Sequence, residues 1–173
     1  MAKKKNKSRD YIEDWAAGCT MRPCAADYIS SVSDILHRDY HNLECRDYSD
    51  IYAWDADGYE HKKYGHQSSE TLDMVFAMDY GKMLMVEAKL NVRNVDNIKG
   101  EVEDKISHTR NYIVSSTSFR SLITPSVVLF GQKRFHEFYN RFRRLNNNKT
   151  NIKPMTLSSF YKEYFGTITV DGF

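Results

Sequence analysis

The segment 71–91, TLDMVFAMDYGKMLMVEAKLN, contains Asp73, Glu87 and Lys89. The two carboxylates could bind a metal ion, and the lysine could act beside it. Two neighbouring carboxylates repel each other unless a cation lies between them. Mg²⁺ is typically held by one or two carboxylates, water and substrate phosphate oxygens. A lysine beside such an ion is partly desolvated, which lowers its pKa and lets it orient or deprotonate a water molecule. These residue types therefore predict a Mg²⁺ site, in which Mn²⁺ could substitute.

The element that must position these residues is a predicted β-hairpin. Two apolar runs flank Asp79–Gly81, and both are rich in strand-forming residues. In a three-residue loop the last position needs a left-handed backbone, which Gly81 adopts without steric cost. That loop sets Val75 opposite Met85 and Asp73 opposite Glu87. Because side chains alternate along a strand, Lys89 shares the side of Glu87.

Both predicted strands are apolar on both sides for most of their length, with charge near the turn and at the open end. This pattern is typical of strands covered on both faces. A salt-bridged cluster at the open end would be the simplest explanation of Asp73, Glu87 and Lys89. However, ions next to buried strands are costly and usually functional. We therefore interpret the three residues as a site.

The motif resembles that of the PD-(D/E)XK nuclease superfamily: Asp73, thirteen intervening residues, then Glu87, Ala88 and Lys89. Leu72 stands where the superfamily usually has proline. The resemblance covers roughly residues 22–142. It implies an α/β, restriction-endonuclease-like fold, with a central mixed β-sheet flanked by helices in the order α-β-β-β-α-β.

The resemblance also implies further metal ligands. The backbone carbonyl of Ala88 would be one. An acid from the first core helix would be another, with Asp39 as the candidate and Asp34 and Glu44 as alternatives. Mg²⁺ would be the cofactor.

Other elements follow from periodicity and turn residues. The patterns predict a helix over 23–40, a second hairpin over 49–66 with its turn at Asp55–Gly58, and a helix over 95–115. The second hairpin would supply the strand next to 71–78. A central strand at 126–131, a helix at 133–144, a short helix at 157–165 and an edge strand at 168–170 complete the chain.

Two groups of side chains are candidates for contacting nucleic acid. On the predicted 95–115 helix, Glu101, Lys105, His108 and Tyr112 form a polar stripe, in which Lys105 and His108 are either surface residues or phosphate contacts. The second group is a basic patch around Glu137, of the kind that binds a phosphate backbone. Its members are Lys133, Arg134, Arg141, Arg143 and Arg144.

The chain has 173 residues and a net charge of +2, which predict one globular domain and leave the partner undetermined. We assign residues 1–21 to a basic N-terminal arm and lead-in, and 22–173 to a single domain. No apolar run approaches the roughly 20 residues that span a bilayer, and the start lacks a signal-peptide core, so a cytoplasmic location is expected. Zinc binding is a less favoured alternative, with its potential ligands Cys24, His37, His41 and Cys45.

The resulting expectation is a Mg²⁺-dependent nuclease, with DNA favoured over RNA as the partner and endonucleolytic cleavage favoured. An RNA-cleaving enzyme of the same fold and a non-catalytic nucleic-acid-binding or assembly protein are the alternatives. Many small nucleases pair as homodimers to cut two strands, but no residue here identifies a dimer interface.

Overall fold

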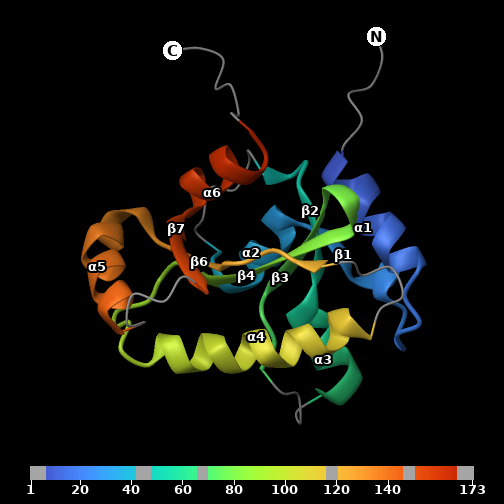
Figure 1. Cartoon of the computed structure of the whole chain (residues 1–173), viewed down its shortest axis with the longest axis horizontal. Helices are drawn as coiled ribbons and strands as arrows, with labels where there is room; N and C mark the ends of the chain where they lie inside the picture. The colour runs from blue at the N-terminus through green and yellow to red at the C-terminus, as the bar shows by residue number, and fades with distance from the viewer. Residues whose placement is uncertain (1–6, 42–47, 66–69, 116–120, 146–150, 167–173) are drawn as a thin grey trace.

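The computed structural model describes residues 7–41, 48–65, 70–115, 121–145 and 151–166. Over these residues the chain is an α/β protein with an open, mixed, seven-stranded sheet flanked by helices (Figure 1). Six strands follow one another in space: β1 (Ile29–Ser31), β2 (Tyr52–Asp55), β3 (Met74–Met78), β4 (Lys82–Lys89), β6 (Ser126–Phe130) and β7 (Ile152–Thr156). The short β5 (Ser121–Leu122) pairs with β4.

Strand direction changes in the middle of the sheet. Strands β1 to β4 pair antiparallel, whereas β4, β6 and β7 pair parallel. Parallel neighbours need crossover connections, and these are provided by α4 (Ile98–Val114) and α5 (Phe135–Leu145). As a result, the start of β3 and the C-terminal ends of β4, β6 and β7 lie along one edge of the sheet.

The predicted β3–β4 hairpin is confirmed together with its register. Met78 pairs with Lys82, and Val75 pairs with Met85. The three-residue loop is a single 3₁₀ turn, Asp79–Gly81, in which Gly81 has φ +69°. The loop therefore fixes which residues face each other at the open end of the hairpin.

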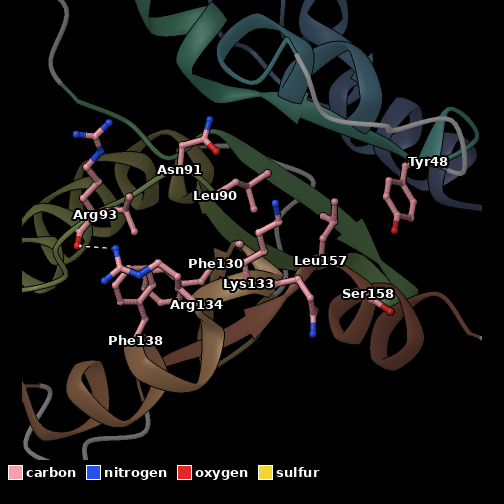
Figure 2. Close-up of a pocket in the computed structure, with 13 residues that line it drawn as sticks. Tyr48, Leu90, Asn91, Arg93, Phe130, Lys133, Arg134, Phe138, Leu157 and Ser158 are labelled. Atoms are coloured by element: carbon pink, nitrogen blue, oxygen red, sulfur yellow. Dashed lines mark hydrogen bonds between the residues drawn. The ribbon is translucent and has the colours of Figure 1, made fainter.

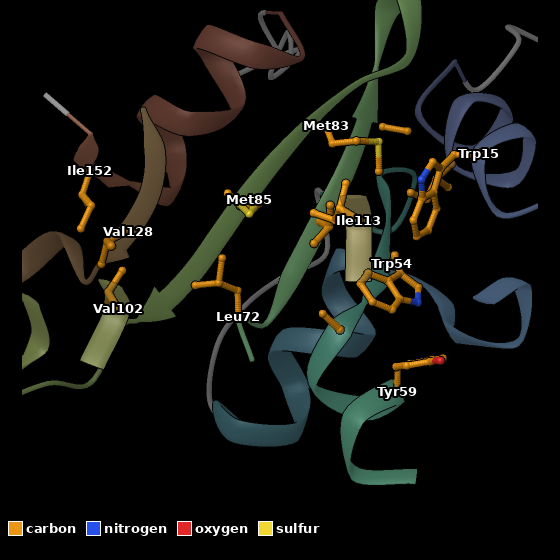
Figure 3. Close-up of a cluster of buried hydrophobic side chains, with 14 of the residues drawn as sticks. Trp15, Trp54, Tyr59, Leu72, Met83, Met85, Val102, Ile113, Val128 and Ile152 are labelled. Atoms are coloured by element: carbon orange, nitrogen blue, oxygen red, sulfur yellow. The ribbon is translucent and has the colours of Figure 1, made fainter. Parts of the chain in front are cut away.

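Helices cover both faces of the sheet, so β3 and β4 are buried on both sides as predicted. One core contains side chains of α1 (Lys7–Ala17), α3 (Ala56–Tyr64), α4 and α5, and Figure 3 shows Trp54 between Trp15 and Tyr59 in this cluster. The other core contains side chains of α2 (Val32–Asp39) and α6 (Leu157–Tyr164). Figure 1 shows α4 and α6 on opposite sides of the sheet.

The predicted hairpin over 49–66 is wrong. Its first strand exists as β2, which pairs with β3 as expected, Trp54 lying opposite Val75. The turn residues, however, begin α3: the Asp55 carboxylate accepts a hydrogen bond of 2.8 Å from the Gly58 N–H. An aspartate followed three residues later by an available N–H suits a helix N-cap as well as a turn.

The N-terminal half of the chain differs from prediction in two further places. The helix expected over 23–40 is divided into a 3₁₀ turn (Ala25–Tyr28), β1 and α2, and α2 begins where Ser31 caps the Asp34 N–H. Helix α1 places the buried Ile12 and Trp15 in the main core. The segment assigned to an arm and lead-in therefore contains a structural element of the domain.

The predicted edge strand at 168–170 lies outside the described residues. None of the helices described has the length and apolar composition needed to cross a membrane.

Two glycine substitutions test the hairpin loop. Gly81→Ala should lower the free energy of unfolding by about 1 kcal/mol, because alanine in the left-handed region clashes with its own carbonyl oxygen. Gly100→Ala is the matched control: in α4 no heavy atom lies within 4 Å of its added Cβ, so alanine should raise stability by about 0.5 kcal/mol. Urea unfolding followed by circular dichroism measures both. Equal losses in the two variants would contradict the loop assignment.

Candidate active site

The open end of the β3–β4 hairpin brings the predicted motif together. Asp73 lies just before β3, and its Oδ2 accepts a hydrogen bond of 2.7 Å from the Ala88 N–H on β4. The pairing of Met74 with Val86 sets the register, so Asp73 faces Glu87 one step further out. The sequence prediction that Asp73 lies beside Glu87 and Lys89 therefore agrees with the structure.

The Glu87 carboxylate is the centre of the cluster. Its side chain has no exposed surface, and its Oε1 lies 2.9 Å from Lys89 Nζ and 2.7 Å from Lys105 Nζ. Within the described part of the chain its Oε2 is buried without a hydrogen-bond partner. A buried carboxylate oxygen in that state has lost its hydration without replacement. It can therefore accept an additional ligand.

Glu101 on α4 completes the charge arrangement. Its Oε1 accepts a hydrogen bond of 2.5 Å from Lys89 and lies 3.7 Å from Lys105 Nζ. With all five groups ionised, three carboxylates and two ammonium groups leave one net negative charge. The cluster is therefore electrostatically suited to a cation.

The pKa of Asp73 is shifted upward. Burial and the nearby Glu87 charge raise the pKa of Asp73 to about 7, against the opposing effects of the Ala88 N–H and the two lysines. Like-charge repulsion in a poorly solvated site favours a proton on one of the two acids. A bound cation would remove this repulsion.

The lowering of the Lys89 pKa expected beside a bound metal ion stays a prediction, and the carboxylates around Lys89 act on its pKa in the opposite sense. Burial does lower it, but the charges of Glu87 and Glu101 outweigh burial and hold the pKa of Lys89 above its usual value. The pKa of Lys105 is raised in the same way, chiefly by Glu87 against the effect of burial. Both side chains are therefore fixed cations. The share of this effect that comes from Glu101 was not expected, because the sequence does not place Glu101 within reach of Lys89.

Tyr40, at the end of α2, also belongs to the site. Its hydroxyl donates a hydrogen bond of 2.8 Å to the Ala88 carbonyl and accepts one of 3.4 Å from the Leu90 N–H. Burial and the Asp73 charge raise the pKa of Tyr40 to about 12, so the hydroxyl stays a donor. A carbonyl oxygen has two lone pairs, so Ala88 can accept Tyr40 and still bind an ion.

Of the helix acids considered from sequence, Asp39 is exposed and makes no described hydrogen bond or ion pair with the cluster, although its charge acts on the Tyr40 hydroxyl. Its role as a metal ligand stays a prediction. Asp34 accepts a hydrogen bond from the Ser31 hydroxyl at the start of α2, and Glu44 lies outside the described residues. The side chain that this helix end contributes through a described hydrogen bond is Tyr40, which the sequence analysis did not single out.

The rest of the polar stripe on α4 serves a second cluster. His108 Nε2 lies 3.2 Å from Glu60 Oε1, and the Tyr112 hydroxyl donates to Glu60 Oε2. Glu60, on α3, is fully buried. Lys105 and His108 thus both contact carboxylates, and their role with nucleic acid stays a prediction. The Glu60 contacts join α3 to α4 and help hold α4 over the site.

The predicted basic patch is partly neutralised. Arg141 makes a two-point ion pair with Asp96, at 2.7 and 2.5 Å, and Arg134 pairs with Glu137 at 2.7 Å. The sequence count included Glu137 but not Asp96, which precedes α4. Lys133, Arg143 and Arg144 are exposed, so these three are the patch residues most available to an external phosphate.

The ligand set fits a hard divalent ion. Asp73, the unpartnered Glu87 Oε2 and the Ala88 carbonyl are all oxygen donors, as Mg²⁺ prefers. Among the residues that the structure describes, no three His, Cys, Asp or Glu side chains are grouped to hold a metal. The remaining ligands of an ion here would be water and substrate. The zinc alternative includes Cys45, which lies outside the described residues.

Comparison with known protein-family models, characterised proteins and solved structures finds no match to this chain. The geometry of the site is therefore the basis for assigning a function.

The shifted Asp73 pKa predicts a pH effect on stability in EDTA. Its folded value of about 7 exceeds the reference value of 3.8, so the native state binds more protons between these pH values. The free energy of unfolding should therefore fall as pH rises through this window. Asp73→Asn keeps an acceptor for the Ala88 N–H and should be more stable than wild type at pH 8, by on the order of 1 kcal/mol, but not at pH 4.

Urea unfolding at several pH values measures this difference. Asp104→Asn, an exposed change on the same α4 that carries Lys105, is the control and should follow wild type. If Asp73→Asn were less stable than wild type at pH 8, the assigned repulsion would be incorrect.

Proposed function

We propose that this chain is a metal-dependent nuclease of the PD-(D/E)XK superfamily, with a restriction-endonuclease-like fold, that hydrolyses phosphodiester bonds in DNA. The observation that carries the proposal is the buried Glu87, with one unpartnered oxygen, set between Asp73 and Lys89 at the open end of a hairpin. Stability alone gives little reason to bury such a group.

The order of elements supports the proposed fold. The elements α2, β2, β3, β4, α4 and β6 occur in the order α-β-β-β-α-β, with α3 inserted between β2 and β3 and the short β5 between α4 and β6. The motif residues lie just before the second of these strands and at the end of the third. A mixed sheet covered by helices on both faces is also consistent with this fold.

The metal ligands would be Asp73, Glu87 Oε2 and the Ala88 carbonyl. When bound, a Mg²⁺ ion there would neutralise charge on the phosphoryl oxygens and lower the pKa of a coordinated water. Tyr40 holds the Ala88 carbonyl in place through its hydroxyl. Asp73 is oriented by the Ala88 N–H. The protein thus fixes the ligand geometry before substrate arrives.

Lys89 would act as a cation and hydrogen-bond donor. Its raised pKa makes it a poor base near neutral pH. Held by Glu87 and Glu101, its ammonium can orient the attacking water and offset negative charge developing on the phosphate. Lys105 adds a second positive charge on the same Glu87 oxygen. Glu101 is a positioning residue, because it acts through Lys89.

Conservative variants test the proposal. Asp73→Asn and Glu87→Gln should each reduce Mg²⁺-dependent cleavage at least about 100-fold, because each removes a charged metal ligand, and Lys89→Met should do the same through loss of the cation. Cleavage assays identify the preferred polymer and the metal. The substrates are plasmid, linear DNA, branched DNA and RNA, each tested with Mg²⁺, Mn²⁺ or EDTA. Asp104→Asn is the control and should retain full activity.

Circular dichroism of each variant verifies folding. Undiminished cleavage by a folded Glu87→Gln variant, or cleavage in EDTA, would reject the proposal.

The exposed basic residues of α5 should contribute to binding. Arg143→Ala and Arg144→Ala should weaken DNA binding and reduce the salt dependence by about one phosphate contact each. Fluorescence anisotropy in EDTA over a range of salt concentrations measures this without cleavage. Lys162→Ala on α6 is the control for loss of one positive charge. If both arginine variants bind like this control at low salt, the patch does not contact DNA.

A further inference from the structure

A cavity of about 940 Å³ opens beside the candidate active site. It lies past the C-terminal ends of the parallel strands β4 and β6, where α/β sheets usually bind ligands. Its size falls at the upper end of the range typical of small-molecule pockets. The lining residues are Tyr48, Leu90, Asn91, Val92, Arg93, Phe130, Gly131, Gln132, Lys133, Arg134, Phe138, Leu157 and Ser158.

The cavity is continuous with the metal-ligand strand. Its wall begins at Leu90, the residue after Lys89, and the Leu90 N–H contacts the same Tyr40 hydroxyl that holds the Ala88 carbonyl. Gly131 allows the two strand ends to approach, since a Cβ at this position would lie 2.4 Å from the Leu90 carbonyl oxygen. A chain bound at the active site could therefore pass directly into the cavity.

The charge of the lining favours an anion. Arg93, Lys133 and Arg134 line the cavity, and none of its described lining residues is acidic. Figure 2 shows Arg93 and Arg134 at one end, Tyr48 and Ser158 at the other, and Lys133 between them. Although Arg134 pairs with Glu137, the cavity as a whole remains positive.

Planar groups at the two ends suit a nucleobase. Tyr48 stacks on Tyr161 with ring centres 3.8 Å apart, which fixes the orientation of its ring. At the other end the Arg134 guanidinium lies 4.7 Å from the centre of the Phe138 ring. Aromatic rings and arginine planes are the surfaces on which proteins stack unpaired bases. Asn91 and Gln132 add amide groups able to hydrogen-bond base edges.

We propose that this cavity binds one unpaired nucleotide of the substrate strand, next to the phosphate that is cleaved. The proposal rests on the nuclease function above and specifies its substrate class: strands with single-stranded tails or flipped nucleotides rather than uninterrupted duplex. A paired and stacked base cannot enter such a pocket without leaving the helix.

Binding measurements in EDTA test the cavity separately from catalysis. The probes are versions of one fluorescent duplex. One version is blunt, two carry a three-nucleotide tail at the 3′ or the 5′ end, and two carry the same tails built from abasic nucleotides. Wild type should bind one tailed duplex at least about fivefold more tightly than the blunt duplex, as expected for stacking of one base. The abasic tail should lose this advantage, because it keeps the phosphates but lacks the base.

Ser158→Trp provides the matched variant. Ser158 is exposed and lines the cavity at the end where Tyr48 lies, so an indole there should occupy that end without removing a charge. It should abolish the tail advantage and leave affinity for blunt duplex unchanged. Thr20→Trp adds the same group at an exposed position outside both the cavity and the basic patch, and should behave as wild type. As a second variant, Lys133→Ala should weaken tailed binding more than blunt binding.

Equal wild-type affinity for blunt and tailed duplexes overturns the proposal, as does a full tail advantage in a folded Ser158→Trp variant. Metal-dependent cleavage without any tail preference would reject the cavity assignment alone. The protein could instead show a base-dependent tail preference that Ser158→Trp removes, but cleave no substrate with any metal. That result would support the cavity assignment and reject the nuclease function.

Discussion

The site depends on one carboxylate without access to solvent. Glu87 is fully buried, and Lys89 from its own strand and Lys105 from α4 both bind the same oxygen. An unpaired charge in a protein interior is very costly, and the two lysines offset that cost for the Glu87 carboxylate. A packed apolar cluster would often be as stable as such an ion group. The second oxygen of Glu87 has no hydrogen-bond partner among the described residues, and the proposed metal ion would supply one ligand contact to it.

The parallel half of the sheet determines what surrounds this carboxylate. Because β4 and β6 run parallel, α4 has to cross back over the sheet between them. That crossing places Glu101 and Lys105 over the end of β4. The same parallel arrangement sets the ends of β4 and β6 side by side, where Leu90 and Gly131 form part of the cavity wall. One topological constraint thus produces both the charged cluster and the cavity.

Helix α4 is held at two places along one polar stripe. Near its start, Glu101 and Lys105 join the Glu87 cluster, and about a turn further on His108 and Tyr112 bind the buried Glu60 of α3. A helix anchored at both points keeps its side chains in a fixed position relative to the strand. Such preorganisation allows charged groups to stabilise developing charge without rearranging.

Local sequence was sufficient for the β3–β4 hairpin, because Gly81 selects the loop and strand alternation then places Asp73 near Glu87 and Lys89. It was insufficient at Asp55, whose side chain suits both a turn and the helix N-cap that it forms. The contributions of Tyr40 and Glu101 were decided by tertiary structure alone. Tyr40 reaches Ala88 across 48 positions of sequence, and Glu101 reaches Lys89 across 12. Contacts at such separations depend on how helices pack against the sheet, which residue spacing within one element does not specify.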